Sequence, residues 1–128
     1  MSTLSVLIIS LLPAIATVES NNDNHAIGDN GRSVGCLQIS AACVEDVNRI
    51  YHTAYTLEDR RNAVQSRRIA LAYLTHYGNA YERRTGKKPT VEVLARIWNG
   101  GPRGYKKSAT LEYWGKVERR MQGRQGAR

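Results

Sequence analysis

The sequence is poor in the residues that build covalently cross-linked or metal-centred folds. Its 128 residues include two cysteines, three histidines and no phenylalanine. Two cysteines exclude a small protein held together by several disulfides, and they exclude a zinc site with four cysteine ligands. Cys36 and Cys43 lie in apolar segments, so we interpret both as small buried hydrophobes, with a disulfide between them left open. The histidines share no ligand spacing, and we expect neither a metal nor a cofactor.

Acidic residues are also scarce, and the basic excess lies in one half of the chain. There are 19 Lys and Arg against 11 Asp and Glu, a net charge of +8, and residues 83–128 hold 13 basic and 3 acidic side chains. A segment with this excess of basic side chains predicts a polyanionic partner: nucleic acid, an anionic membrane or a bacterial cell wall. The sequence lacks a recognition-helix signature and a strand of interleaved aromatic and basic residues, so we expect no nucleic acid.

The first 16 residues allow two interpretations. Residues 4–16 form an apolar run as long as a signal-peptide core, and Ala14-Ile15-Ala16 resembles a cleavage site. No Lys or Arg precedes the run, however, and the same segment fits a buried first helix of the fold. Residues 1–10 are therefore either an apolar export or anchor extension, which could contact a membrane, or simply part of this helix.

Hydropathy and turn signals predict a single helical domain over residues 1–128 with one small hairpin, of class mainly α (α+β). The hairpin is expected within residues 25–40, with its second strand at 33–39, and residues 122–128 are expected to be a frayed tail. A loop is expected at 99–104. Helices are expected at 41–51, from a Thr56–Asp59 capping box to about Tyr81, at 91–98 after a Thr90 cap, and from a Thr110 cap to Met121.

Glu19 is the most informative ionisable residue, because it ends an apolar segment just before a polar turn. A carboxyl against an apolar helix face loses hydration, so we expect its pKa to rise and the group to serve as a general acid. Cleavage of glycosides requires such an acid. The alternative is a solvated carboxylate, which the helix dipole would oppose at that end.

Four segments resemble the catalytic domains of soluble lytic transglycosylases (SLT type), in the lysozyme-like superfamily. In order they are ATVES (16–20), GDNGRSVGCLQIS (28–40), IWNGGP (97–102) and TLEYWGKV (110–117). The resemblance covers about residues 11–120. It implies a lysozyme-like fold with the hairpin beside an active-site cleft, and peptidoglycan glycan strands as the substrate.

The resemblance also implies roles for individual residues. Glu19 matches the acid/base, Gln38 the strand glutamine that faces the substrate, and Asn99 a loop asparagine near it. Trp98 stands where the family usually has tyrosine, and Tyr113 matches the tyrosine of the closing segment. Gln38 bonding only the hairpin backbone and Trp98 belonging to the core remain alternatives. Since cleavage after Ala16 would remove the helix that supports Glu19, we expect residues 11–20 to be retained as helix.

The product of the reaction depends on a second carboxylate. Animal lysozymes carry it at the place of Ser33, and a serine cannot stabilise an oxocarbenium-like centre as a carboxylate does. Ser33 therefore favours a lytic transglycosylase, in which the 6-hydroxyl of the muramic acid attacks intramolecularly and gives a 1,6-anhydro end. One alternative is a goose-type-like lysozyme that uses Asp23 or Asp29 to activate water, and another is a non-catalytic wall-binding domain. We expect a monomer that acts in the cell envelope or periplasm, after secretion, or after delivery by a phage.

Overall fold

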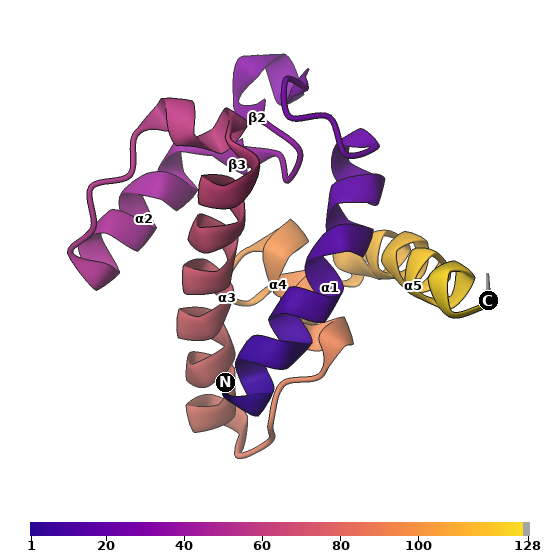
Figure 1. Ribbon diagram of the computed structural model, residues 1–128. Helices are drawn as coiled ribbons and strands as arrows, with labels where there is room; N and C mark the ends of the chain where they lie inside the picture. The colour runs from indigo at the N-terminus through magenta and orange to yellow at the C-terminus, as the bar shows by residue number, and fades with distance from the viewer. Residues whose placement is uncertain (127–128) are drawn as a thin grey trace. The chain divides into compact units, whose positions relative to one another are not determined.

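The computed structural model describes the backbone of residues 1–126 and the side chains of residues 1–123 (Figure 1). Its helices are α1 (Thr3–Ser20), α2 (Ala41–Tyr51), α3 (Ala63–Thr85), α4 (Val91–Gly100) and α5 (Leu111–Gly126). Short 3₁₀ helices are η1 (Asp29–Gly31), η2 (Leu57–Arg61), η3 (Gly104–Lys106) and η4 (Ser108–Thr110). The strands β1 (Ile27–Gly28), β2 (Ser33–Val34) and β3 (Ile39–Ser40) form one antiparallel sheet in that order. This confirms the predicted mainly helical class.

The chain divides into two compact units. The first, which we call the sheet unit, is Ala16–Tyr73; the second, the basic unit, combines Met1–Ile15 with Leu74–Arg128. The divisions fall inside α1 and inside α3. The sheet unit holds six basic and seven acidic side chains, and the basic unit thirteen and four. The charge asymmetry of the sequence therefore follows the division into units.

The small sheet differs from the hairpin that the sequence predicts. Val34 pairs with Ile27 on one side and with Ile39 on the other. A continuous strand over 33–39 is therefore wrong, because the chain turns between β2 and β3. Gly35 (φ 89°) and Gln38 (φ 54°) are left-handed, and the amide of Gln38 donates to the carbonyl of Gly35 at 3.0 Å. Left-handed residues interrupt the extended backbone that a strand needs.

The helices of the sheet unit begin at side-chain caps. Ser40 Oγ accepts from the amide of Cys43 at 3.1 Å and opens α2, whose range agrees with the prediction. Asp59 accepts from the amide of Thr56 at 2.8 Å as predicted, but this pair opens η2 and not the long helix. Asn62 instead caps α3, since its Oδ1 accepts from the amides of Val64 and Gln65 at 2.9 Å each. The long helix therefore starts at Ala63.

The basic unit packs its helices through small and aliphatic residues. A Cβ at Gly78 of α3 would lie 3.2 Å from Leu94 of α4 and 3.3 Å from Leu4 of α1, so these elements approach closely there. Thr90 caps α4 as predicted, with its Oγ1 accepting from the amide of Val93 at 3.2 Å. α4 extends to Gly100, into the predicted loop, and Gly101 (φ 90°) follows it.

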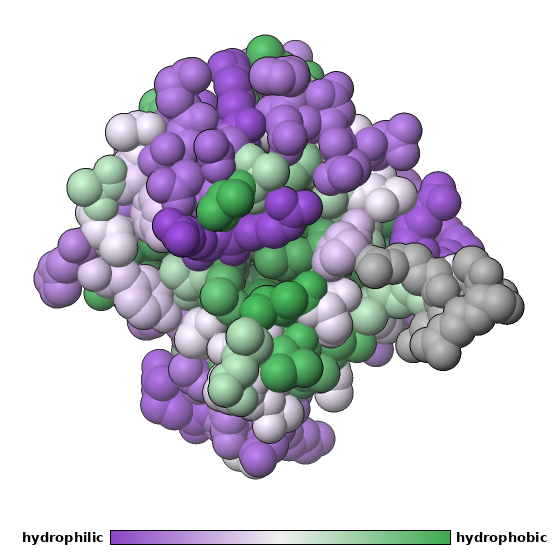
Figure 2. All heavy atoms as spheres, viewed as in Figure 1, coloured by the Kyte–Doolittle hydropathy of each residue, from purple (hydrophilic) through white to green (hydrophobic). Residues whose placement is uncertain are grey.

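The chain is helical near both of its ends, which agrees with the first-helix interpretation of the N-terminal segment. α1 starts at Thr3, and α5 continues to Gly126, into the predicted frayed segment 122–128; residues 127–128 lie outside the described part. By length and composition α1 could cross a membrane, with a mean hydropathy of 1.8, a property that signal sequences and core helices share. Ile8, Leu11 and Ile15 are fully buried, as in a core helix. Figure 2 shows apolar side chains gathered over the first part of α1, where Val6 and Ile9 are exposed.

Candidate active site

Glu19 lies half-buried in the last turn of α1, one residue before the helix ends. The helix stops because Asn21 (φ 56°) and Asn22 (φ 61°) are both left-handed. Asparagine tolerates this conformation better than most residues. The amides of Asn21 and Asn22 donate to the carbonyls of Thr17 (2.9 Å) and Ala16 (3.0 Å), which closes the helix end. The sequence thus fixes the backbone on both sides of Glu19.

Ser20 joins this helix end to the turn between β2 and β3. Its hydroxyl donates to the carbonyl of Cys36 at 2.8 Å and accepts from the amide of Asp23 at 3.0 Å. The next anchor is Cys36 itself, which is buried with its Sγ 3.8 Å from Ser66 Oγ of α3. Glu19 therefore stands beside a residue that ties three segments of the sheet unit together.

Gln38 has a structural role within the sheet unit. Its side-chain NH₂ group donates to the carbonyls of Ala26 (3.2 Å) and Gly35 (2.9 Å). Its Oε1 lies over Gly28, where a Cβ would be only 2.4 Å away. The structure thus shows the backbone bonding that the sequence left as an alternative for Gln38. Its predicted contact with substrate stays a prediction.

Arg60 supports the same turn from the outside. A Cβ at Gly35 would lie 1.8 Å from the carbonyl oxygen of Arg60, so only glycine fits there. The guanidinium of Arg60 in turn donates to the carbonyl of Ile39 in β3 at 3.2 Å. Burial, with the neighbouring charge of Arg61, lowers the pKa of Arg60 from its ordinary value. The sequence analysis missed this contact, for which the glycine is the one local signal.

The predicted partners of Glu19 lie in the same unit. Ser33 is half-buried in β2, opposite Gly28 and Ser40. Asp23 accepts from the amide of His25 through Oδ1 at 2.9 Å, within the turn after α1. Asp29 is exposed and left-handed (φ 56°) in the turn between β1 and β2. A left-handed residue other than glycine costs backbone energy, and such residues cluster at functional sites.

The remaining predicted site residues belong to the basic unit. Trp98 is half-buried and Asn99 exposed, both in the last turn of α4, while Tyr113 is half-buried in the first turn of α5. The two helices that carry these residues, α4 and α5, pack against each other within this unit.

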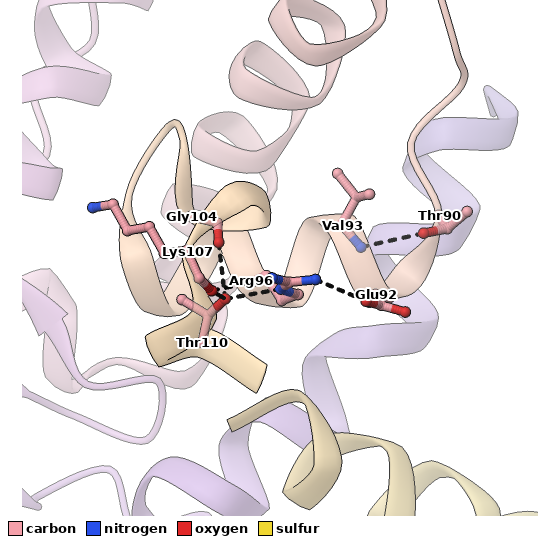
Figure 3. Close-up of polar contacts among 7 residues, drawn as sticks. All are labelled: Thr90, Glu92, Val93, Arg96, Gly104, Lys107 and Thr110. Atoms are coloured by element: carbon pink, nitrogen blue, oxygen red, sulfur yellow. Dashed lines mark hydrogen bonds and ion pairs between the residues drawn. The ribbon is translucent and has the colours of Figure 1, made fainter. Parts of the chain in front are cut away.

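Figure 3 shows a polar network that the sequence analysis missed. Arg96 of α4 donates to Glu92 Oε2 (2.9 Å), to Thr110 Oγ1 (2.8 Å) and to the carbonyl of Lys107 (3.1 Å). The ammonium of Lys107 donates to the carbonyl of Gly100 at 2.7 Å. We call Arg96, Lys107 and Thr110 the α4 clamp. Only the Glu92–Arg96 spacing, typical of a helical ion pair, is visible in the sequence.

Thr110 lies directly before α5, at the position where the sequence predicts the cap of the last helix. It is buried, and its hydroxyl lies 2.8 Å from the carbonyl oxygens of Gly104 and Lys107 while accepting from Arg96. The hydroxyl therefore closes the segment before α5 and belongs to the clamp.

In the described part of the chain, neither the two thiols nor any cluster of metal-binding side chains forms a second candidate site. Cys36 and Cys43 are both free thiols, and burial, with the charge of Asp46, raises the pKa of Cys43 to about 12. Such a thiol stays protonated and is a poor nucleophile. Among residues 1–126, the His, Cys, Asp and Glu side chains form no group of three that could hold a metal ion.

Comparisons with known proteins point to one family. The model of the transglycosylase SLT domain matches residues 7–116. A segment of 57 residues is 42% identical to Lysozyme 1 of Crassostrea virginica, covering 44% of this chain and 29% of that protein. A segment of 45 residues is 49% identical to Invertebrate-type lysozyme 6 of Caenorhabditis elegans, covering 33% and 32%. The matched segments thus span less than a third of either relative.

The fold has a solved counterpart. It is a chain in the crystal structure of Aeromonas hydrophila PliI in complex with Meretrix lusoria lysozyme, with a TM-score of 0.71 at 26% identity. The match covers 86% of this chain and 87% of that one. The fold is therefore lysozyme-like, as the sequence predicts.

Proposed function

Because the chain belongs to the transglycosylase SLT domain family, we propose that it cleaves the β-1,4 bond between N-acetylmuramic acid and N-acetylglucosamine in peptidoglycan. The observation that carries the proposal is the construction around Glu19. A glutamic acid lies in the last turn of α1, and the next residue, Ser20, ties the helix end to the turn between β2 and β3 at 2.8 Å. Acid catalysis needs a carboxyl held in one place by rigid elements.

In this proposal Glu19 gives its proton to the glycosidic oxygen as the bond to the sugar breaks. The sugar then carries positive charge at its anomeric carbon. Either water or the 6-hydroxyl of the muramic acid attacks that carbon, and a carboxylate takes the proton of the attacking group. The two acceptors give different ends: a reducing sugar from water and a 1,6-anhydro sugar from the internal hydroxyl.

We favour water, with Asp29 as the second carboxylate. The similar segments of the two relatives, at 42% and 49% identity, come from proteins named lysozymes. Asp29 belongs to the same compact unit as Glu19, and its left-handed backbone at φ 56° is a conformation kept at a cost. Asp23 is less suited, since its Oδ1 already accepts the amide of His25.

The second candidate is a lytic transglycosylase with Glu19 as its only carboxylate. The family model supports it, and so does Ser33 at the place where animal lysozymes carry their second carboxylate. In that reaction Glu19, once deprotonated, takes the proton of the internal hydroxyl.

Digestion of purified sacculi in water labelled with heavy oxygen tests both candidates, with the released fragments weighed by mass spectrometry. Hydrolysis places the label in new reducing ends. Asp29→Asn should lower their release about 100-fold, as expected for a lost general base or charge stabiliser. Asp23→Asn, the matched control, should remain within about twofold of wild type.

Other outcomes are equally decisive. Unlabelled 1,6-anhydro ends from the wild type would overturn hydrolysis and support the single-glutamate reaction. Release of neither product would overturn both and leave a wall-binding domain.

A further inference from the structure

The C-terminal end of α4 is closed by side chains from the segment that follows it. Beyond the activity itself, and resting on the proposed function, we propose that Arg96 is a positioning residue for substrate binding. It sets the end of α4, which carries Trp98 and Asn99, through the α4 clamp. It acts through these residues and is not itself a substrate contact.

The end of α4 is bonded to residues 101–110 at several points. The amide of Gly101 donates to the carbonyl of Ile97 at 2.8 Å, and Gly104 donates to Gly101 at 2.7 Å. Lys107 reaches back to the carbonyl of Gly100 at 2.7 Å. A helix end carries partial negative charge on its free carbonyls, so an ammonium there is favourable. The backbone on both sides of Asn99 is thus held.

Arg96 contributes the bonds that a simpler cation cannot make. Its Nε and Nη2 atoms donate in different directions, to the hydroxyl of Thr110 and to the carbonyl of Lys107. The Arg96 side chain is only 13% exposed. A lysine would keep the charge but has no planar fork of donors. Both bonds therefore depend on the guanidinium group.

The fit between the two segments is tight around these bonds. A Cβ at Gly104 would lie 2.0 Å from the carbonyl oxygen of Arg96, and one at Gly100 would lie 2.6 Å from Cγ2 of Thr110. Small shifts of residues 104–110 would therefore push directly on the turn of α4 that holds Trp98 and Asn99. This links the clamp to the proposed binding residues without any further contact.

The ion pair of Arg96 with Glu92 gives a matched control. It joins two residues of the same helix, and Glu92 is 43% exposed. Such a pair does not connect α4 to the segment that follows it, and exposed helical pairs contribute little. If Arg96 acts through the clamp, removing the charge of Glu92 should leave substrate binding unchanged.

The test compares Arg96→Lys and Thr110→Val with Thr110→Ser and Glu92→Gln. Valine keeps the shape of Thr110 without its hydroxyl, whereas serine keeps the hydroxyl. Binding of soluble, peptide-free glycan strands is followed by tryptophan fluorescence, since Trp98 is one of two tryptophans. KM, kcat, their pH profiles and the melting temperature are measured on the same variants.

We expect Arg96→Lys and Thr110→Val to raise the dissociation constant and KM about tenfold, the effect of losing one well-placed hydrogen bond. Their kcat should stay within about twofold, with unchanged pH profiles, and Thr110→Ser and Glu92→Gln should bind as the wild type does. Lower melting temperatures with unchanged binding would make Arg96 purely structural and overturn the inference. Equal weakening by Glu92→Gln would overturn it as well.

Two further outcomes separate this inference from the proposed function. If Arg96→Lys does not fold, the Thr110 pair decides, and equal binding by the valine and serine variants refutes the clamp. A wild type that binds glycan without cleaving it refutes the proposed activity alone, while the binding comparison still tests Arg96. A wild type that does neither refutes both.

Discussion

The two helix ends that carry the candidate residues are held by different chemistry. At the end of α1, in the sheet unit, the tie is the neutral hydroxyl of Ser20 on a backbone carbonyl. At the end of α4, in the basic unit, the ties are the guanidinium of Arg96 and the ammonium of Lys107. The units differ in the same sense, with net charges of −1 and +9.

This difference matches the work proposed for each end. A cation beside an acid favours its ionised form, so a neutral hydroxyl is the better support next to a group that must hold a proton. A helix end without such a group gains from cations, because they complement the dipole. We infer that the end of α1 is built for proton transfer and the end of α4 for binding.

Substitution in the turn between β2 and β3, to which Ser20 is bonded, should have the largest effect on stability. Gly35 and Gly31 share nearly the same backbone, φ 89° and 87°, but only Gly35 has an atom in the way, the carbonyl oxygen of Arg60. Gly31→Ala should cost about 1 kcal/mol through its conformation. Gly35→Ala should cost about 4 kcal/mol or more, because the backbones of two segments must separate.

Urea unfolding of both alanine variants measures the difference. Equal losses would mean that the contact with Arg60 does not fix the turn.

Removing the Ser20 tie should have a smaller effect. Ser20→Ala loses a hydroxyl with two part-buried or turn partners, Cys36 and Asp23, and should lower the free energy of unfolding by about 1–2 kcal/mol. Ser10 is the control, because it lies on the same helix, exposed, and donates only to Leu7 at 2.8 Å. Ser10→Ala should change stability by less than about 0.5 kcal/mol. The measurement is chemical denaturation of both variants. Equal free energies of unfolding would show that the hydrogen bonds of Ser20 do not stabilise the helix end.

The smallest predicted effect concerns the thiol of Cys43, which burial in the sheet unit keeps protonated. The pKa of Cys43 is about 12 against an ordinary 9.0, so the folded chain keeps a proton that the unfolded chain releases. The free energy of unfolding should therefore be unaffected by this group below pH about 9 and fall above it, by about 1 kcal/mol at pH 10. Cys43→Ala should lack this part of the loss. If the wild type and Cys43→Ala lose the same free energy of unfolding between pH 8 and 10, the thiol lies in a more hydrated site.

Local patterns predict the helices but not the turns between them. The range of α2 and the Thr90 cap of α4 follow from spacing and side-chain chemistry within a few residues. The Thr56–Asp59 bond is also local, yet the start of α3 is set by Asn62, a competing cap six residues on from Thr56. The break between β2 and β3 has one local signal, Gly35, whereas the contact of this glycine with Arg60 lies far along the chain and has none.

The same distinction applies to the site. The place of Glu19 at a helix end could be predicted, because an apolar segment and an asparagine-rich turn are adjacent in the sequence. The hydrogen bonds of the Gln38 side chain to Ala26 and Gly35 could not be predicted, since they depend on how the strands pair. The Arg96–Thr110 bond joins residues 14 apart across a glycine-rich segment, beyond the reach of helical spacing.

The division of labour between the two helix ends is tested most directly by steady-state kinetics of Glu19→Gln and Arg96→Lys on the same soluble glycan strands. The amide of Glu19→Gln cannot give a proton, so kcat should fall about 10²–10⁴-fold while the dissociation constant stays near that of wild type. Arg96→Lys should do the reverse, with a raised KM and a preserved kcat. Glu45→Gln, at an exposed glutamate of α2, serves as the control for the first change. A Glu19→Gln variant that keeps more than about a tenth of the wild-type kcat, well short of the loss expected for a missing general acid, would contradict the account.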